Sequence, residues 1–107
     1  MRAVVFEAAP WERRYLTRAL ALHQLRPRFV ADPLTEETWR LAAGARILSV
    51  FIYSTVTATL LRRLPQLRFI ATRSTGFDHL NLSVCRHRRI QVSNVPSYGE
   101  KIGRAHV

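Results

Sequence analysis

The fold of this chain is decided by residues 64–80, which read LPQLRFIATRSTGFDHL. Pro65 stops the helical pattern that precedes it, and the apolar run 69–72 is typical of a buried strand. Gly76 then marks a turn, and Asn81 is placed to cap a short helix that runs through Cys85. A helix, a buried strand, a turn and a second helix in direct succession indicate an alternating βα arrangement.

The same alternation extends outward in both directions from this stretch. Patterns typical of strands are predicted at residues 3–6, 28–30, 47–52, 69–72 and 90–93. Helical patterns separate them at residues 11–25, 35–43, 56–64 and 81–85. Such an alternation folds into a parallel sheet with helices on both faces, because parallel neighbours need a crossover. The predicted fold class is therefore α/β, with ligands expected at the carboxyl ends of the strands.

Two of the helical patterns carry more detailed expectations. In residues 11–25, one side of the helix carries Arg14 and Arg18, and the apolar residues that keep helical spacing are Trp11, Tyr15, Ala19 and Leu22. In residues 35–43, Thr35 is expected to cap the start of the helix and Gly44 to end it.

Length and composition favour one soluble domain. The chain has 107 residues, of which 48% are hydrophobic, so it has room for a single core. The longest unbroken apolar run, at residues 50–53, is far too short to span a membrane, and the first residues lead directly into a strand pattern. We therefore expect a cytoplasmic protein with no membrane partner. Cys85 is the single cysteine, which predicts a packing residue and neither a disulfide nor a metal site.

The charge balance is strongly basic but does not predict a nucleic-acid partner. The chain carries 17 basic and 7 acidic residues, and every basic residue except Lys101 is an arginine. The arginines form small scattered groups without an interleaved aromatic platform or a recognition-helix motif. We therefore expect no nucleic acid among the partners of the chain.

The loop at residues 72–78 is the strongest candidate for a ligand site. Gly76 would let the backbone approach a ligand closely, leaving successive N–H groups free to point at an anion such as a carboxylate. A plain tight turn, with Asp78 or Asn81 capping the next helix, is the alternative that the residues leave open. A second loop at residues 94–99 carries Pro96 and aims Tyr98 towards the same crevice.

Taken together, these two loops resemble the catalytic domain of the D-2-hydroxyacid dehydrogenases, nearest to the D-lactate dehydrogenase branch. The resemblance covers residues 51–100 and rests on residues 64–80 and on residues 92–100, which read VSNVPSYGE. It implies a flavodoxin-like catalytic domain joined to a Rossmann domain that binds NAD. It also implies hydride transfer between NAD and a small 2-hydroxy or 2-keto acid by a homo-oligomeric enzyme. Asn81 and Arg89 depart from the family pattern, which usually has Asp and Gly there.

Three site residues follow from this resemblance. Thr75 and Gly76 would hold the substrate carboxylate through backbone N–H groups, and Tyr98 would line the pocket. The family's catalytic Arg, Glu and His, and its glycine-rich NAD fingerprint, match nothing in these residues, and no Gly-x-Gly-x-x-Gly is present. The histidines at positions 23, 79, 87 and 106 are interpreted as surface or capping residues.

The resemblance also divides the chain. We expect residues 1–100 to form part of a catalytic, substrate-binding domain whose NAD-binding domain is absent, and which has no activity alone. Residues 101–107, KIGRAHV, follow no family pattern and resemble the translation of a sequencing adapter, so we interpret them as foreign.

Two functions from other classes compete with an oxidoreductase. A receiver-type signalling module shares the length and the strand pattern, but it needs acidic residues and a lysine at loop positions. Those positions read Glu7-Ala8, Tyr53-Ser54 and Asn94-Val95-Pro96. A basic nucleic-acid-binding α/β module is the third possibility, and its binding would fall steeply with salt.

Overall fold

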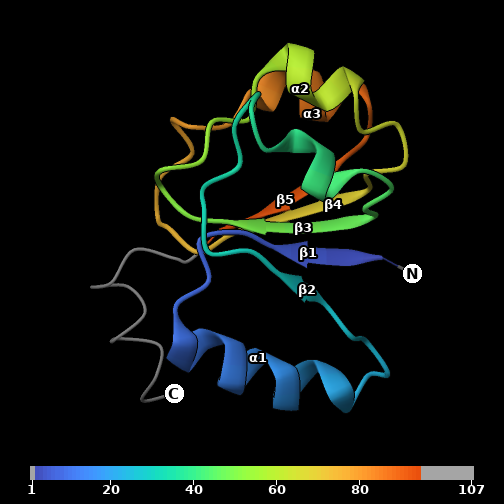
Figure 1. The fold of residues 1–107 in the computed structure, drawn as a ribbon. Coiled ribbons are helices and arrows are strands. Elements are labelled where there is room, and N and C mark those ends of the chain that lie inside the picture. The colour runs from blue at the N-terminus through green and yellow to red at the C-terminus, as the bar shows by residue number, and fades with distance from the viewer. Residues whose placement is uncertain (1, 95–107) are drawn as a thin grey trace, which may run out of the picture.

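The computed structural model describes residues 2–94, and Figure 1 shows its fold. The strands and helices follow one another in the predicted order. The strands are β1 (Ala3–Val5), β2 (Arg28–Phe29), β3 (Ile47–Val50), β4 (Phe69–Thr72) and β5 (Gln91–Ser93). The helices are α1 (Pro10–Ala21), α2 (Ala58–Arg62) and α3 (Leu82–His87), and a 3-10 helix, η1 (Trp39–Ala42), lies between β2 and β3.

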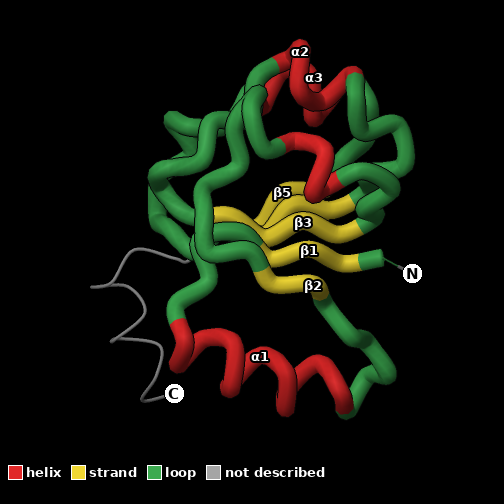
Figure 2. The backbone as a smooth tube through the Cα atoms, in the orientation of Figure 1, coloured by secondary structure: helices red, strands yellow, loops and turns green. Residues whose placement is uncertain are grey.

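All strands run parallel, in the order β2-β1-β3-β4-β5 across the sheet. The chain moves outward from β1 to β2 and then returns past β1 to β3, which places the topological switch point between β1 and β3. Figure 2 shows the sheet as one layer, with α1 on one side and α2 and α3 on the other. This arrangement confirms the predicted α/β class, a flavodoxin-like parallel sheet with helices on both faces.

One face of the sheet packs the hydrophobic core. Val4, Leu48 and Ile70 are register partners on β1, β3 and β4, and each is fully buried. Leu60 and Leu61 of α2 are fully buried in the same cluster. Burying one leucine-sized side chain contributes about 1.5–3 kcal/mol, so this layer is a principal source of stability.

Cys85 of α3 belongs to the same core, as its sequence context predicted. Its side chain is buried and takes part in no disulfide. Burial raises the pKa of its thiol, and the positive charge of Arg88 lowers that pKa in part. The thiol therefore stays protonated and acts as an apolar packing group.

The apolar stripe that the sequence placed on α1 is largely exposed to solvent. Trp11 is 63% exposed, Tyr15 59% and Leu22 84%, and α1 has no fully buried residue. The half-buried residues of the helix are Glu12, Leu16, Ala19 and Leu20, and of these only Ala19 belongs to the predicted stripe. An ion pair between Glu12 and Arg73, at the end of β4, fixes this rotation of the helix. Periodicity alone could not choose between two overlapping stripes, because the deciding contact comes from a distant strand.

The ends of several elements also differ from the predicted ones, and α1 stops at Ala21 instead of residue 25. β3 ends at Val50, so Phe51 and Ile52 lie in an exposed loop instead of the predicted strand. The helix expected at residues 35–43 is reduced to η1, although Thr35 Oγ1 accepts a hydrogen bond from the N–H of Glu37. Gly44 follows with a φ of 80°, the left-handed conformation that ends this segment. Within residues 2–94, no helix has the length and hydropathy needed to cross a membrane.

Candidate functional site

The loops after β1 and β3 are joined by the carboxylate of Glu7. Its Oε2 accepts from the N–H of Phe51 at 2.9 Å and from the Ser54 hydroxyl at 2.6 Å. Its Oε1 accepts from the N–H of Tyr53 at 3.1 Å. Ser54 is fully buried and in turn accepts from the N–H of Leu34 at 2.9 Å. These bonds end β3 and hold the loop against the carboxyl edge of the sheet.

Arg73, the first residue after β4, ties the other side of the same edge together. Its Nε donates to Glu12 Oε2 and its Nη1 to Ser49 Oγ, both at 2.8 Å. Its Nη2 donates to the carbonyl oxygens of Phe6 and Glu7, also at 2.8 Å. The nitrogens of the guanidinium therefore all donate to groups of the protein, and these bonds position the loop that follows Arg73.

A directed chain of hydrogen bonds shapes the loop at residues 72–78. Ser74 donates to the carbonyl oxygen of Gly76 at 2.9 Å, its hydroxyl lies 2.7 Å from that of Thr72, and Thr72 Oγ1 lies 2.8 Å from His79 Nε2. A carbonyl oxygen only accepts, and each hydroxyl has a single hydrogen to donate. Thr72 must therefore donate to Ser74, and His79 Nε2 must donate to Thr72. The bonds assign a protonated Nε2 to His79.

This finding corrects the interpretation of His79 as a surface or capping residue. The side chain is half-buried, and Thr72 and Ser74 are buried. Capping of α3 is done by Asn81, whose Oδ1 accepts from the N–H of Val84 at 3.0 Å, as predicted. Together, His79, Thr72 and Ser74 hold the carbonyl of Gly76 towards the protein.

The N–H groups of Thr75 and Gly76 are not engaged in this way. Both residues are exposed, and within residues 2–94 neither N–H group meets an acceptor. The space beside the Gly76 Cα is open, since a Cβ placed there would meet nothing within 4 Å. Asn94 directly follows β5, and its side-chain Nδ2 donates to the carbonyl oxygen of Thr75 at 2.7 Å. The loop thus presents two adjacent N–H groups on a backbone whose carbonyl oxygens at Thr75 and Gly76 both accept hydrogen bonds.

The third predicted site residue, Tyr98, lies outside the described residues, as do residues 101–107. A cleft of about 600 Å³ opens between α1 and this edge, lined by Glu7, Ala9, Trp11, Glu12, Leu16, Phe51 and Arg73. Thr75 and Gly76 do not line it, and both are exposed. The same residues contain no cluster of three or more His, Cys, Asp or Glu side chains that could hold a metal ion.

Sequence reasoning found the loop but missed the side chains that hold it. Arg73 was not singled out, and its partners Glu12 and Ser49 are 61 and 24 residues away. The one available signal was that Glu7 and Arg73 each directly follow a predicted strand, so that both lie at the carboxyl edge of the sheet. That position favours polar groups that join the carboxyl ends of the strands.

Comparison with known proteins identifies the family. A family model described as the D-isomer specific 2-hydroxyacid dehydrogenase catalytic domain matches residues 3–101. The chain belongs to this family. It is 32% identical over 104 residues to a D-lactate dehydrogenase of Curvularia clavata, covering 92% of this chain and 30% of that protein. It is 25% identical over 108 residues to a 2-hydroxyacid dehydrogenase homolog of Haemophilus influenzae, covering 99% of this chain and 33% of that protein.

Solved structures of 2-hydroxyacid dehydrogenases share the fold. The D-lactate dehydrogenase of Aquifex aeolicus, complexed with NAD and lactic acid, superposes with a TM-score of 0.80 at 27% identity, covering 97% of this chain and 31% of that one. The apo D-lactate dehydrogenase of Escherichia coli gives a TM-score of 0.83 at 23% identity, covering 99% and 35%. The chain thus spans about a third of the length of the dehydrogenases that it matches.

Proposed function

We propose that this chain supplies the substrate-carboxylate site of an NAD-dependent D-2-hydroxyacid dehydrogenase that acts on a small acid of the lactate or pyruvate type. The observation that carries the proposal is the pair of exposed N–H groups at Thr75 and Gly76, at the carboxyl edge of the sheet. This edge is where parallel α/β sheets bind ligands. Membership of the dehydrogenase family, and the lactic acid bound by the Aquifex aeolicus relative, support this substrate class.

The chemistry of the site is binding and orientation. Two adjacent N–H groups can each donate to one oxygen of a carboxylate, and such charge-assisted bonds are stronger than neutral ones. Because His79, Thr72 and Ser74 hold the Gly76 carbonyl inward, its negative end does not compete with the anion. The carboxylate is thereby fixed, and the neighbouring C2 atom of the acid is held at a defined distance from the loop.

NAD, when bound, supplies or accepts the hydride. The residues of this chain do not fit a dinucleotide, because the sequence has no Gly-x-Gly-x-x-Gly to approach a pyrophosphate. We therefore infer that NAD is bound, and the acid/base group of the reaction supplied, by residues of the longer enzyme that are not among these 107. On its own, the 107-residue chain is inactive in this proposal.

The remaining sequence-based expectations are part of the same proposal. Residues 1–100 form part of the substrate-binding domain, and residues 101–107 are foreign to it. Tyr98 lines the pocket, and the whole enzyme is a cytoplasmic homo-oligomer without a nucleic-acid partner.

The proposal is tested by replacing Thr75 with proline in the longer enzyme, because proline removes one of the two N–H donors. We expect KM for pyruvate to rise about tenfold or more, in line with the loss of a hydrogen bond to a charged group. Thr75→Ser keeps the N–H group and is the matched control, with an expected KM close to that of the parent. An unchanged KM in a folded Thr75→Pro enzyme would show that this loop does not bind the substrate carboxylate.

A further inference from the structure

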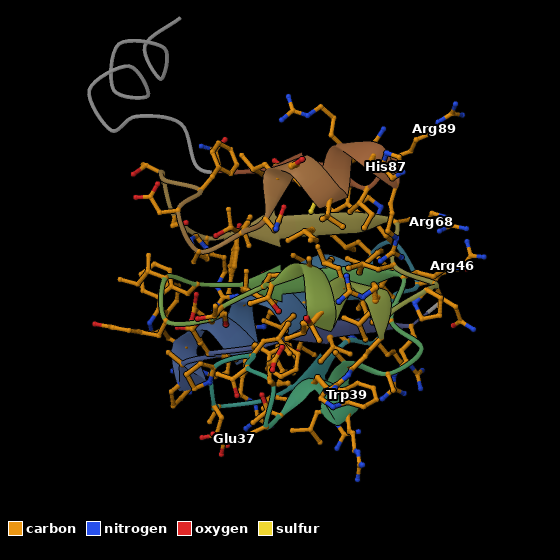
Figure 3. The ribbon with its side chains drawn as sticks, turned by 90° about the horizontal axis from the view of Figure 1, so that it is seen from above. Glu37, Trp39, Arg46, Arg68, His87 and Arg89 are labelled. Carbon is orange, nitrogen blue, oxygen red and sulfur yellow. The ribbon has the colours of Figure 1, made fainter. Side chains whose placement is uncertain are left out.

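The side chain of Asn94 reaches the candidate site from the neighbouring strand. Asn94 directly follows β5, and β5 pairs in parallel with β4, so that Ser93 is the register partner of Ala71. The two strands therefore end side by side, and Asn94 lies next to the loop that follows β4. Figure 3 shows Arg68 and Arg89, which lie just before the two strands, at the opposite end of the molecule.

The hydrogen bond between Asn94 and Thr75 requires an amide at position 94. Asn94 Nδ2 donates to the carbonyl oxygen of Thr75 at 2.7 Å, across 19 residues of sequence. A carbonyl oxygen can only accept, so the group that faces it must carry a hydrogen. An ionised aspartate has the same shape but no hydrogen to donate, and it would face the carbonyl with a second acceptor.

This bond also fixes the N–H group of Gly76, because that N–H and the carbonyl of Thr75 belong to the same peptide unit. The peptide unit is planar, and every peptide bond within residues 2–94 is trans. In a trans unit the C=O and N–H bonds point in opposite directions. A bond that holds the carbonyl towards Asn94 therefore directs the N–H of Gly76 away from Asn94.

Glycine gives this peptide unit a second orientation, which the bond from Asn94 opposes. In β-turns, types I and II differ by a flip of the central peptide unit, and the flip needs a positive φ at the residue that follows. The φ of Gly76 lies outside the left-handed region in the structure, but glycine can adopt that region without a steric penalty. A flip would replace the N–H donor by the carbonyl oxygen of Thr75, which repels a carboxylate.

The hydrogen bond from Ser74 acts on the next peptide unit instead. Ser74 Oγ donates to the carbonyl oxygen of Gly76 at 2.9 Å, and that carbonyl shares its peptide unit with the N–H of Phe77. The chain of bonds that begins at His79 therefore sets the direction of the Phe77 N–H. Within residues 2–94, the bond from Asn94 is the one that holds the unit carrying the N–H of Gly76.

We propose that Asn94 is a positioning residue for the substrate carboxylate, and that it acts by fixing the direction of the Gly76 N–H through the carbonyl of Thr75. The inference rests on the proposed function, because it needs the carboxylate to bind at this loop. A donor that already points in the binding direction does not have to be ordered when the acid binds, so less binding free energy is lost.

NMR of the labelled 107-residue chain without ligand tests the orientation. The NOE between Thr75 Hα and the Gly76 amide proton depends on ψ of Thr75, and the three-bond coupling of the Gly76 amide proton depends on its φ. We expect Asn94→Leu, which removes the donor, to change both values. Asn94→Asp keeps the shape of the side chain and is expected to change them in the same way. Parent values in these variants would overturn the proposal.

Ser74→Ala is the matched control, because it releases the neighbouring peptide unit. We expect it to change the corresponding NOE and coupling of the Phe77 amide proton more than those of Gly76, with the reverse pattern in Asn94→Leu. Equal changes at both amides in both variants would mean that each bond only stabilises the loop in general. That result would overturn the proposal.

The double variant Asn94→Leu/Gly76→Ala tests whether the freedom of glycine is what Asn94 restrains. A Cβ at Gly76 meets nothing within 4 Å, and alanine disfavours the positive φ that the flip needs. We therefore expect the added alanine to restore most of the parent's NOE between residues 75 and 76. Values that stay at those of Asn94→Leu would contradict the proposal.

Titration with pyruvate separates this inference from the proposed function. We expect Asn94→Leu to raise the Kd about three- to fivefold, less than the loss of a charge-assisted hydrogen bond, because Gly76 keeps its N–H and loses only its fixed direction. An unchanged Kd would overturn the inference alone, since the parent would still bind pyruvate at the loop. Absence of amide shifts at Thr75 and Gly76 in the parent would overturn the proposed function, whereas the ligand-free NMR data would still decide whether Asn94 orients the Gly76 N–H.

Discussion

Replacing Arg73 with methionine is expected to lower the free energy of unfolding by about 3 kcal/mol. The Arg73 side chain, which is 18% exposed, donates to Glu12, to Ser49 and to the carbonyl oxygens of Phe6 and Glu7. A hydrogen bond that involves a charged group contributes about 1.5–3 kcal/mol. Bonds that share one guanidinium are not additive, so the total is set near the lower end of the cost of breaking a buried ion pair.

Thermal and urea unfolding followed by circular dichroism measure this change. For a domain of this size, about 3 kcal/mol corresponds to a fall in Tm of roughly 12–24 °C. Arg86→Met is the matched control, because Arg86 is exposed on α3 and should change stability by less than about 0.5 kcal/mol. In a double-mutant cycle with Glu12→Gln, the coupling energy is expected to be about 1–2 kcal/mol. A loss below about 1 kcal/mol for Arg73→Met would refute the role given to this network.

Two further predictions concern the loop and the activity of the chain. Thr72→Val removes the hydroxyl that links His79 to Ser74, so it should destabilise the chain by about 1–3 kcal/mol and speed amide hydrogen exchange at residues 74–77. Ser83→Ala, at an exposed position on α3, is its control, and equal exchange rates in both variants would show that the relay does not order the loop. The 107-residue chain mixed with NADH and pyruvate should show no change in NADH absorbance, because its residues offer no dinucleotide cradle. Measurable turnover would show that these residues contain a complete active site.

The positions of β1, β3 and β4 along the chain could be predicted from the sequence because each of these strands is a short, mostly apolar run next to charged residues. Ile70 and Leu48 are central to such runs, and both are fully buried in the structure. The α/β class then follows from the alternation with helices. The ends of the elements could not be predicted in the same way. β3 stops at Val50 because Glu7 takes up the N–H groups of Phe51 and Tyr53, and Glu7 is more than 40 residues distant in sequence.

The candidate site, too, could be predicted only in part from the sequence. Thr75 and Gly76 were predicted as site residues because a glycine turn after a buried strand and the family resemblance point to the same place. The hydrogen-bond relay from His79 was missed because a histidine on a turn gives no local sign of its partner. The exposure of most of the apolar stripe on α1 was not foreseen for a similar reason, since the ion pair between Glu12 and Arg73 sets the rotation of the helix. Long-range polar contacts therefore account for most of what sequence patterns did not reveal.

The most direct test of the central claim, that the N–H groups of Thr75 and Gly76 bind a carboxylate, is a titration of the ¹⁵N-labelled chain with pyruvate, observed by NMR. Two hydrogen bonds without the rest of a pocket support only roughly millimolar affinity, so the titration extends to tens of millimolar. We predict that the largest amide shifts occur at Thr75 and Gly76, and that neutral acetone produces none. Shifts centred on other residues, with Thr75 and Gly76 unmoved, would contradict the account.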